Sequence, residues 1–171
     1  VEGEKLWAFW RQRLGGALPV LNLPTDRPRP LVQTYAGSTS RFLLPRELSA
    51  RLSAFARDNG ATDYMVLLAV YNVLLHRYTG QTEFLVGCPT SGRNSDTLSG
   101  LVGHFINPVV MRSDLSGDPS FQDFLIDTRA VVLDALAHQE YPFSLIVEKI
   151  QPVRDPGCSP IFQTDFTLQR P

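Results

Sequence analysis

The sequence predicts a mixed α/β fold in which helices pack against a β-sheet. Tyr64 to Leu75 is apolar on every side except at Asn72, which predicts a helix inside the core. Phe84 to Cys88 is a continuous apolar run, typical of a strand buried on both faces. Helical and strand patterns alternate along the rest of the chain, which indicates the α/β class. We expect the other elements to pack around this central helix and strand.

The central helix has clear sequence signals at both ends. Thr62 is of the type that accepts a hydrogen bond at a helix start, and Asp63 favours the positive end of the helix. Gly80 supplies a left-handed residue that ends the helix. The apolar run is well short of the ~18 to 20 residues that a membrane span needs, so we expect no membrane helix.

The first third of the chain combines two helices with extended segments. Helical spacing predicts a helix from Glu4 to Leu14, and a second, amphipathic helix from Arg46 to Asn59 that Gly60 ends. The proline-rich segment from Leu23 to Pro30 must be extended. It is either a linker or, as we favour, a strap across the surface. Ser38 to Leu44 alternates and predicts a strand.

The second half of the chain continues the alternation. Turn residues throughout Thr90 to Gly100 predict a loop. Pro108 either argues against a strand at its position or places that strand at a sheet edge. The patterns predict, in order, a strand from Phe105 to Leu115, a helix from Asp118 or Ser120 to about His138 with Leu136 among its inward residues, a helix from Pro142 to about Ile150, and a strand from Ile161 to Leu168.

Composition indicates one ordinary globular domain. With 16 basic and 17 acidic residues the formal net charge is -1, so we expect no nucleic-acid partner. Cys88 and Cys158 lie far apart and match no metal-binding spacing. The first residues are not a signal peptide, so a cytoplasmic location is expected. The chain begins without Met, already within a helical pattern, and ends on a strand-like run, so we expect a piece cut from a longer polypeptide at both ends.

The histidines offer the first candidates for a functional site. His76 and His138 lie at predicted helix ends, where a structural role is the simpler interpretation. His104 lies between Gly103 and Phe105 at the mouth of a strand, where side chains face a cleft. We expect it to line that cleft rather than to act as a catalyst. The sequence has no Gly-x-Ser-x-Gly elbow, phosphate-binding glycine loop or His-Glu-x-x-His motif.

Five short motifs occur in one order along the chain. They are Leu23 to Pro30 (L-P-T-D-R-P-R-P), Leu74 to Gln81 with Val86 to Pro89, Val102 to Pro108 (V-G-H-F-I-N-P), His138 to Phe143 (H-Q-E-Y-P-F), and Arg154-Asp155 with Ser159 to Gln163. In this order they resemble the condensation domains of nonribosomal peptide synthetases, which belong to the chloramphenicol-acetyltransferase-like superfamily. The resemblance covers essentially the whole chain.

The chain also departs from the family pattern. Pro108 stands where the family usually has threonine, and Ser144 stands where a glutamate commonly follows Pro-Phe. Gly157-Cys158 replaces the usual Ser-Arg or a similar pair. The catalytic signature His-His-x-x-x-Asp-Gly does not occur. In the family it belongs to the first lobe, so the resemblance implies that residues 1–171 are part of the second, C-terminal lobe, truncated at both ends and without a catalytic residue of its own.

The resemblance implies a reaction, a site and partners. Condensation domains form an amide bond between a donor acyl or peptidyl group and an aminoacyl acceptor, each carried on the phosphopantetheine arm of a peptidyl carrier protein. The two arms meet in a tunnel between two lobes, and this chain would supply one wall. The implied substrate-binding residues are Gly103, His104, Phe105 and Asn107. The Asn107 carboxamide would either orient the amine or carbonyl, or close a backbone turn.

The remaining implications concern binding partners and alternatives. We expect no directly bound cofactor or metal, and partners in the donor and acceptor carrier proteins, the first lobe and a neighbouring adenylation domain. The first lobe would cover an apolar face of this chain. Alternatives are the same lobe of an epimerisation or heterocyclisation domain, a free-standing carrier-dependent acyltransferase, and a non-catalytic module that docks carrier proteins or a neighbouring domain. The chain alone is expected to be inactive.

Overall fold

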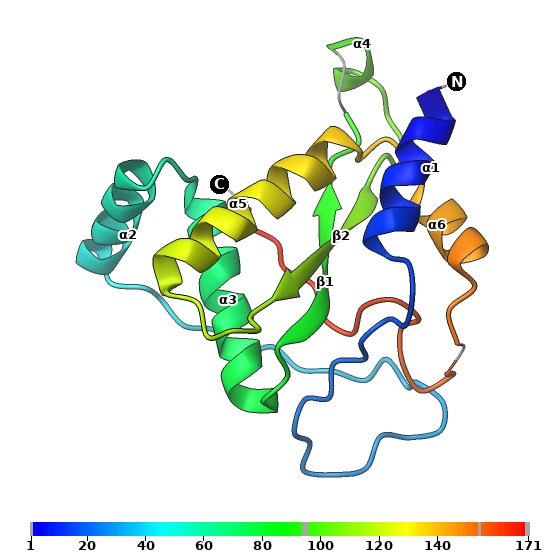
Figure 1. Ribbon diagram of the computed structural model, residues 1–171, viewed down its shortest axis with the longest axis horizontal. Helices are drawn as coiled ribbons and strands as arrows, with labels where there is room; N and C mark the ends of the chain where they lie inside the picture. The colour runs from blue at the N-terminus through cyan, green and yellow to red at the C-terminus, as the bar shows by residue number, and fades with distance from the viewer. Residues whose placement is uncertain (1, 94–95, 154, 170–171) are drawn as a thin grey trace.

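The protein has the mixed α/β architecture that the sequence predicts (Figure 1). The computed structural model describes residues 2–93, 96–153 and 155–169. The elements are, in chain order, α1 (Glu2–Arg13), α2 (Arg46–Asp58), α3 (Asp63–Thr79), β1 (Glu83–Thr90), α4 (Asp96–Ser99), β2 (Asn107–Asp114), α5 (Phe121–Ala137) and α6 (Phe143–Ile150).

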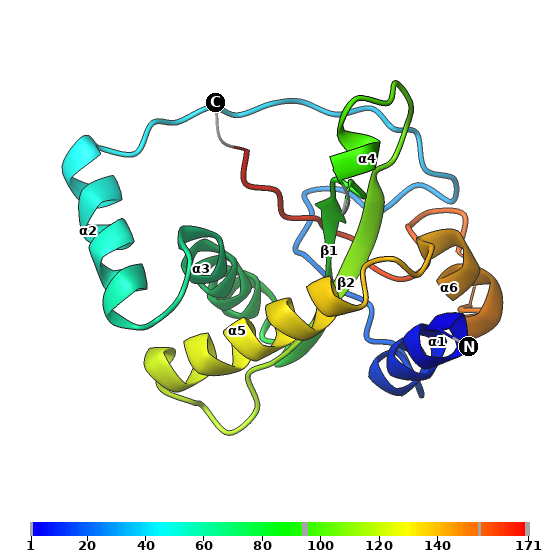
Figure 2. The ribbon, with the colours of Figure 1, turned by 90° about the horizontal axis from the view of Figure 1, so that it is seen from above.

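The two strands form an antiparallel sheet between two layers of helices. Cys88 of β1 lies opposite Val109 of β2. Figure 2 shows α3 and α5 on one side of the strands, and α1 and α6 on the other. On the first side the buried Asn72 of α3 donates to the Ser113 hydroxyl of β2 at 2.7 Å. On the second side Arg112 of β2 donates to the Arg13 carbonyl at the end of α1 at 3.0 Å.

Helix α3 lies in the core, as predicted, but only one of its sides is buried. The buried positions are Met65, Val66, Leu68, Ala69, Asn72 and Leu75. Val70, Leu74 and Tyr78 recur one turn apart on another side, and 48%, 49% and 65% of their surfaces are exposed. An apolar run predicts a buried environment, but each side is buried only where another segment packs against it. No helix in the described part of the chain has both the length and the apolar character needed to cross a bilayer.

The helix ends follow the predicted capping chemistry. The Thr62 hydroxyl accepts from the Met65 N–H at 3.3 Å, and Gly80 is left-handed with φ of 69°. Of the two predicted starts for α5, Ser120 is the cap, because its hydroxyl accepts from the Asp123 N–H at 3.2 Å. The predicted inward position of Leu136 in this helix is wrong, since 39% of its surface is exposed.

The long segment between α1 and α2, which the structure describes throughout, contains neither helix nor strand and runs along the lower side of the molecule in Figure 1. Several hydrogen bonds hold it, among them those of the Asn22 N–H to Gln81 Oε1 at 2.7 Å and of the Gln33 N–H to the Pro156 carbonyl at 2.9 Å. The predicted strand from Ser38 to Leu44 is wrong. Alternation alone does not make a strand, which also needs a hydrogen-bonding neighbour, and no described strand pairs with this segment.

The predicted strand from Ile161 to Leu168 is wrong as well, because only one bridge forms. The Gly87 N–H donates to the Thr164 carbonyl at 3.0 Å, and the Phe166 N–H donates to the Gly87 carbonyl at 2.8 Å. The next donor on β1 in this parallel register would be Pro89, which has no N–H. Toward the end of β1 the ladder therefore has no further donor from this strand.

Two further predictions are corrected or left open by the structure. The predicted loop from Thr90 to Gly100 contains the short helix α4, and β1 extends to Thr90. Turn-forming residues also start helices, so their presence does not exclude one. From the sequence we also predict a structural role for Arg154-Asp155, as a salt-bridged or loop-fixing pair; this prediction lies outside the described residues, because Arg154 is not among them.

Helices α1 and α5 meet over the outer edge of β2. The Phe9 ring stacks on the His138 ring with 3.8 Å between centroids, and Trp10 Nε1 donates to the His138 carbonyl at 3.0 Å. The Arg13 guanidinium lies 4.0 Å from the Asp134 carboxylate. In the described chain β2 pairs with β1 alone, so of the two alternatives at Pro108 the edge strand is confirmed.

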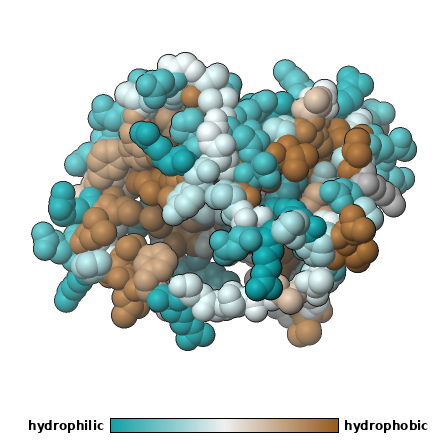
Figure 3. All heavy atoms as spheres, turned by 90° about the horizontal axis from the view of Figure 1, so that it is seen from below, coloured by the Kyte–Doolittle hydropathy of each residue, from teal (hydrophilic) through white to brown (hydrophobic). Residues whose placement is uncertain are grey.

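Apolar side chains remain exposed outside the core. They gather in brown areas on the face that Figure 3 shows from below. The most exposed large ones on the extended segment are Leu31, Tyr35, Phe42 and Leu43, each more than four-fifths exposed. Patches of this kind mark surfaces that pack against something else.

Candidate functional site

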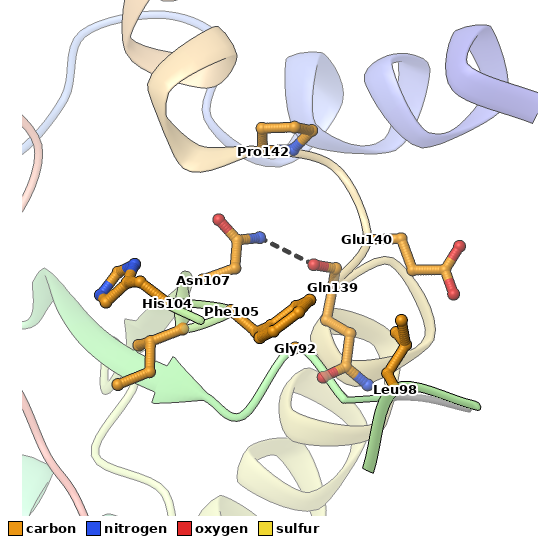
Figure 4. Close-up of a pocket in the computed structure, with 9 residues that line it drawn as sticks. Gly92, Leu98, His104, Phe105, Asn107, Gln139, Glu140 and Pro142 are labelled. Carbon is orange, nitrogen blue, oxygen red and sulfur yellow. Dashed lines mark hydrogen bonds between the residues drawn. The ribbon is translucent and has the colours of Figure 1, made fainter. Parts of the chain in front are cut away.

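A cavity of about 420 Å³ opens where β2 begins, between the loop after β1 and the turn from α5 to α6 (Figure 4). Its lining residues are Gly92, Leu98, His104, Phe105, Ile106, Asn107, Gln139, Glu140 and Pro142, and it is called here the Phe105 cavity. The structure thus brings together His104, Phe105 and Asn107 of the four predicted substrate-binding residues. Gly103 lies beside the Phe105 ring without lining the cavity.

Asn107 braces the turn between α5 and α6. Its Nδ2 donates to the carbonyls of Gln139 at 2.8 Å and Tyr141 at 2.9 Å, and its Oδ1 accepts from the Phe143 N–H at 2.9 Å. Both amide hydrogens are therefore used within the protein. The carboxamide closes a backbone turn, one that is more than thirty residues away in sequence, and a substrate role for it stays a prediction.

The loop after β1 is fixed against Phe105 by two residues that the sequence analysis did not select. Gly92 has φ of 62°, and a Cβ added there would lie 1.8 Å from the Phe105 carbonyl oxygen. Only glycine fits this position. The Arg93 guanidinium lies 4.4 Å from the centroid of the Phe105 ring and also donates to the Leu98 carbonyl. The sequence signal was a glycine inside a turn-rich stretch, which is too common to single out a site.

The histidines take different places. His76 Nδ1 lies 2.8 Å from the Gln81 carbonyl, and His138 Nδ1 lies 2.7 Å from the Asp134 carbonyl, so both hold structural contacts. His104 is exposed at one end of the Phe105 cavity, and Figure 4 shows it and Glu140 at opposite ends. Among the described residues that line this cavity, no histidine is coupled to a carboxylate. They can bind and orient a ligand, and they provide no acid–base pair.

A second cavity of about 300 Å³ adjoins the first and is called here the Tyr64 cavity. Its lining residues are Tyr64, Cys88, Pro89, Thr90, Ser91, Val109, Met111, Leu136, Gln139, Phe166, Thr167 and Leu168. Burial raises the pKa of the Cys88 thiol to about 11 and also raises the pKa of Tyr64. Both groups stay neutral near pH 7, and the other lining residues carry no charge, so the cavity presents an uncharged and mainly apolar surface.

Comparison with known proteins places this chain in a family. The family model for the Condensation domain matches residues 2–170. One of the linear gramicidin synthase proteins of Brevibacillus parabrevis is 50% identical over 162 residues, which cover 95% of this chain and 3% of that protein. Phosphinothricin tripeptide synthetase of Streptomyces viridochromogenes is 44% identical over 165 residues, which cover 96% of this chain and 14% of that protein.

A solved structure agrees with these sequence matches. The crystal structure of a four-domain nonribosomal peptide synthetase superposes with a TM-score of 0.95 at 28% identity, over 99% of this chain and 13% of that chain. The protein belongs to the condensation domain family, as its motifs indicated. The chain spans only a small part of the length of these relatives.

Proposed function

We propose that this chain forms part of the second lobe of a condensation domain and lines the tunnel in which an amide bond forms. The observation that carries the proposal is the meeting of two family motifs at one cavity. Asn107, from the motif Val102 to Pro108, makes all three of its side-chain hydrogen bonds to the motif His138 to Phe143. The Phe105 cavity lies between the two motifs.

In the proposed reaction the amine of an aminoacyl acceptor attacks the thioester carbonyl of a donor. A C–N bond forms, the C–S bond breaks, the donor's carrier keeps the free thiol, and the amine loses a proton. Both groups arrive on phosphopantetheine arms of carrier proteins. A tunnel of this kind works by holding the two reacting groups in line at close range.

The part assigned to this chain is binding and orientation. Phe105 offers an apolar surface to the arm or acyl group, His104 offers a ring nitrogen at the mouth, and Asn107 Oδ1, which accepts one hydrogen bond from the Phe143 N–H, keeps a second lone pair. The proton acceptor would come from the first lobe, since the described lining residues contain no acid–base pair. The first lobe, the donor and acceptor carriers and a neighbouring adenylation domain in the cytoplasm are the partners of this proposal.

The uncovered apolar residues fit the same proposal. Val70, Leu74 and Tyr78 on α3 are exposed in this chain, and under the proposal the rest of the domain would bury them. A non-catalytic docking module would also bury them, so this feature does not separate the two functions.

The test uses the full-length protein with separately loaded donor and acceptor carrier proteins, and mass spectrometry of the products. We expect an amide product from the full-length protein and none from the 171-residue chain, with product restored when the first lobe is added in trans. Amide formed by the 171 residues alone would contradict the assignment of the base to another lobe. A full-length protein that binds both carriers and forms no amide would favour the docking module.

A further inference from the structure

Gln139 is the one described residue that lines both the Phe105 cavity and the Tyr64 cavity. Its backbone is fixed, because its carbonyl accepts from Asn107 Nδ2 at 2.8 Å. Opposite it, consecutive residues face different cavities: Ser91 lines the Tyr64 cavity and Gly92 lines the Phe105 cavity. Figure 4 shows the Gln139 side chain pointing toward Gly92 and Leu98. The partition between the two cavities therefore consists of this side chain and the loop it faces.

The Gln139 carboxamide has no hydrogen bond to another described residue, although the side chain is half-buried. Two other half-buried glutamines differ. Gln81 accepts from the Asn22 N–H at 2.7 Å and donates to the Val20 carbonyl at 2.9 Å. Gln163 accepts from the Leu21 N–H at 2.7 Å and donates to the Ser159 carbonyl at 3.1 Å. Partly buried polar groups are normally paired, so the Gln139 carboxamide is available for a ligand.

The Gln139 carboxamide is polar, whereas the Tyr64 cavity beside it is mainly apolar. A carboxamide has two N–H donors and one carbonyl acceptor, which complement the N–H and C=O of a secondary amide. Such amides occur in peptidyl groups and in the pantetheine arm. The neighbouring Tyr64 cavity is walled mainly by apolar side chains, namely Val109, Met111, Leu136, Phe166 and Leu168. Its volume of about 300 Å³ suits one uncharged side chain rather than a whole substrate.

We propose that Gln139 is a specificity-determining residue: its carboxamide binds an amide of the carrier-bound substrate, and its side chain limits the size of the apolar group that enters the Tyr64 cavity. This inference rests on the proposed condensation function. It predicts separate effects for removing the Gln139 carboxamide and for shortening the Gln139 side chain. Gln139→Met keeps the length of the side chain and loses the carboxamide. Gln139→Ala removes both.

The experiment measures kcat/KM for amide formation by the full-length protein with alanyl, leucyl and tryptophanyl groups, presented as donor and, in separate reactions, as acceptor. Gln139→Met should lower kcat/KM about three- to tenfold for all groups alike, the effect of one lost hydrogen bond. Gln139→Ala should in addition raise the tryptophanyl-to-alanyl ratio by about tenfold or more in one of the two positions. The controls are Gln122→Met and Gln122→Ala on the exposed side of α5, away from both cavities.

The outcomes separate the inference from the function on which it rests. If the protein forms the amide and the Gln139 variants match the Gln122 variants, the inference is overturned and the condensation function stands. If the protein forms no amide with any pair, the function is contradicted. The inference is then decided by calorimetric binding of a leucyl-pantetheine analogue whose thioester sulfur is replaced by NH. Binding about three- to tenfold weaker to Gln139→Met than to Gln122→Met supports it, and equal binding overturns it. Thermal unfolding of each variant confirms that it is folded.

Discussion

The two edges of the β1–β2 sheet are covered in different ways. Over β2, two helices meet through side chains, with Phe9 stacked on His138 and Trp10 bonded to the His138 carbonyl. Beside β1, a stretch of backbone is held by two hydrogen bonds at Gly87, whose lack of a side chain leaves room for the Phe162 ring. A Cβ on Gly87 would lie 2.3 Å from that ring. The packing over β2 depends on several side-chain contacts. The attachment of the segment beside β1 depends on a glycine at position 87.

The difference matters because each edge supports one cavity. Asn107, the first residue of β2, ties the end of α5 to the start of α6 and so shapes the Phe105 cavity. Phe166 and Leu168, from the segment beside β1, wall the Tyr64 cavity. We therefore expect the Phe105 cavity to be rigid through polar bracing, and the Tyr64 cavity to depend on how firmly that segment is attached.

The largest expected effect is at Asn107, which tests the bracing of the β2 side. Asn107→Ala leaves two carbonyls and one N–H without partners, which we expect to lower the free energy of unfolding by about 3–5 kcal/mol. Urea denaturation measures this loss. Asn22→Ala, at an exposed side chain, is the matched control. A loss below about 1 kcal/mol would show that the brace is dispensable.

A pH effect tests the β1 side. Burial is the largest cause of the raised Cys88 pKa of about 11, and the Asp165 carboxylate beside it adds to the rise. Because the folded protein holds this proton more tightly than the unfolded chain, stability is complete below about pH 9 and falls as the pH rises to about 11. The loss should reach about 2–3 kcal/mol. Urea denaturation across this range measures it.

Cys88→Ala provides the control for that titration. The variant lacks the titrating thiol, so its stability should fall less steeply between about pH 9 and about pH 11. Equal slopes for the two proteins would mean that Cys88 does not carry the pH dependence.

Gly87→Ala sharpens the comparison of the two edges directly. The added methyl group would collide with the Phe162 ring, and we expect the free energy of unfolding to fall by about 1–3 kcal/mol. Amide hydrogen exchange at Phe166 should become faster, while exchange in β2 is unchanged. Gly37→Ala, with no atom within 4 Å of the added Cβ, is the control. Unchanged exchange at Phe166 would show that the segment does not depend on Gly87.

The smallest expected effect is at the surface contact between α1 and α5. Arg13 and Asp134 lie 4.0 Å apart with their side chains 33% and 59% exposed, so solvent screens the pair. Asp134→Asn should change the free energy of unfolding by less than about 0.5 kcal/mol. A loss above about 1 kcal/mol in urea denaturation would mean that this ion pair, rather than the aromatic contacts, holds the helices together.

The sequence by itself determined the five longer helices of the described chain and several of their caps, and it indicated where a candidate site would lie. Apolar spacing, Thr62, Gly80 and Ser120 act over one or two turns, so local chemistry decides them. The motif around Asn107 was also recognisable, and three of its predicted substrate-binding residues line the Phe105 cavity.

Only the tertiary structure decided which segments have neighbours. Ser38 to Leu44 and Ile161 to Leu168 carry strand patterns but lack a partner or the proline-free ladder that a strand requires. The roles of Gln139 and Gly92 follow only from contacts with residues that are distant in the sequence. A hydrogen-bonding partner that is distant in the sequence does not alter the local residue pattern. For this reason the hydrogen bonds of Asn107 and the partition between the two cavities could be identified only from the tertiary structure.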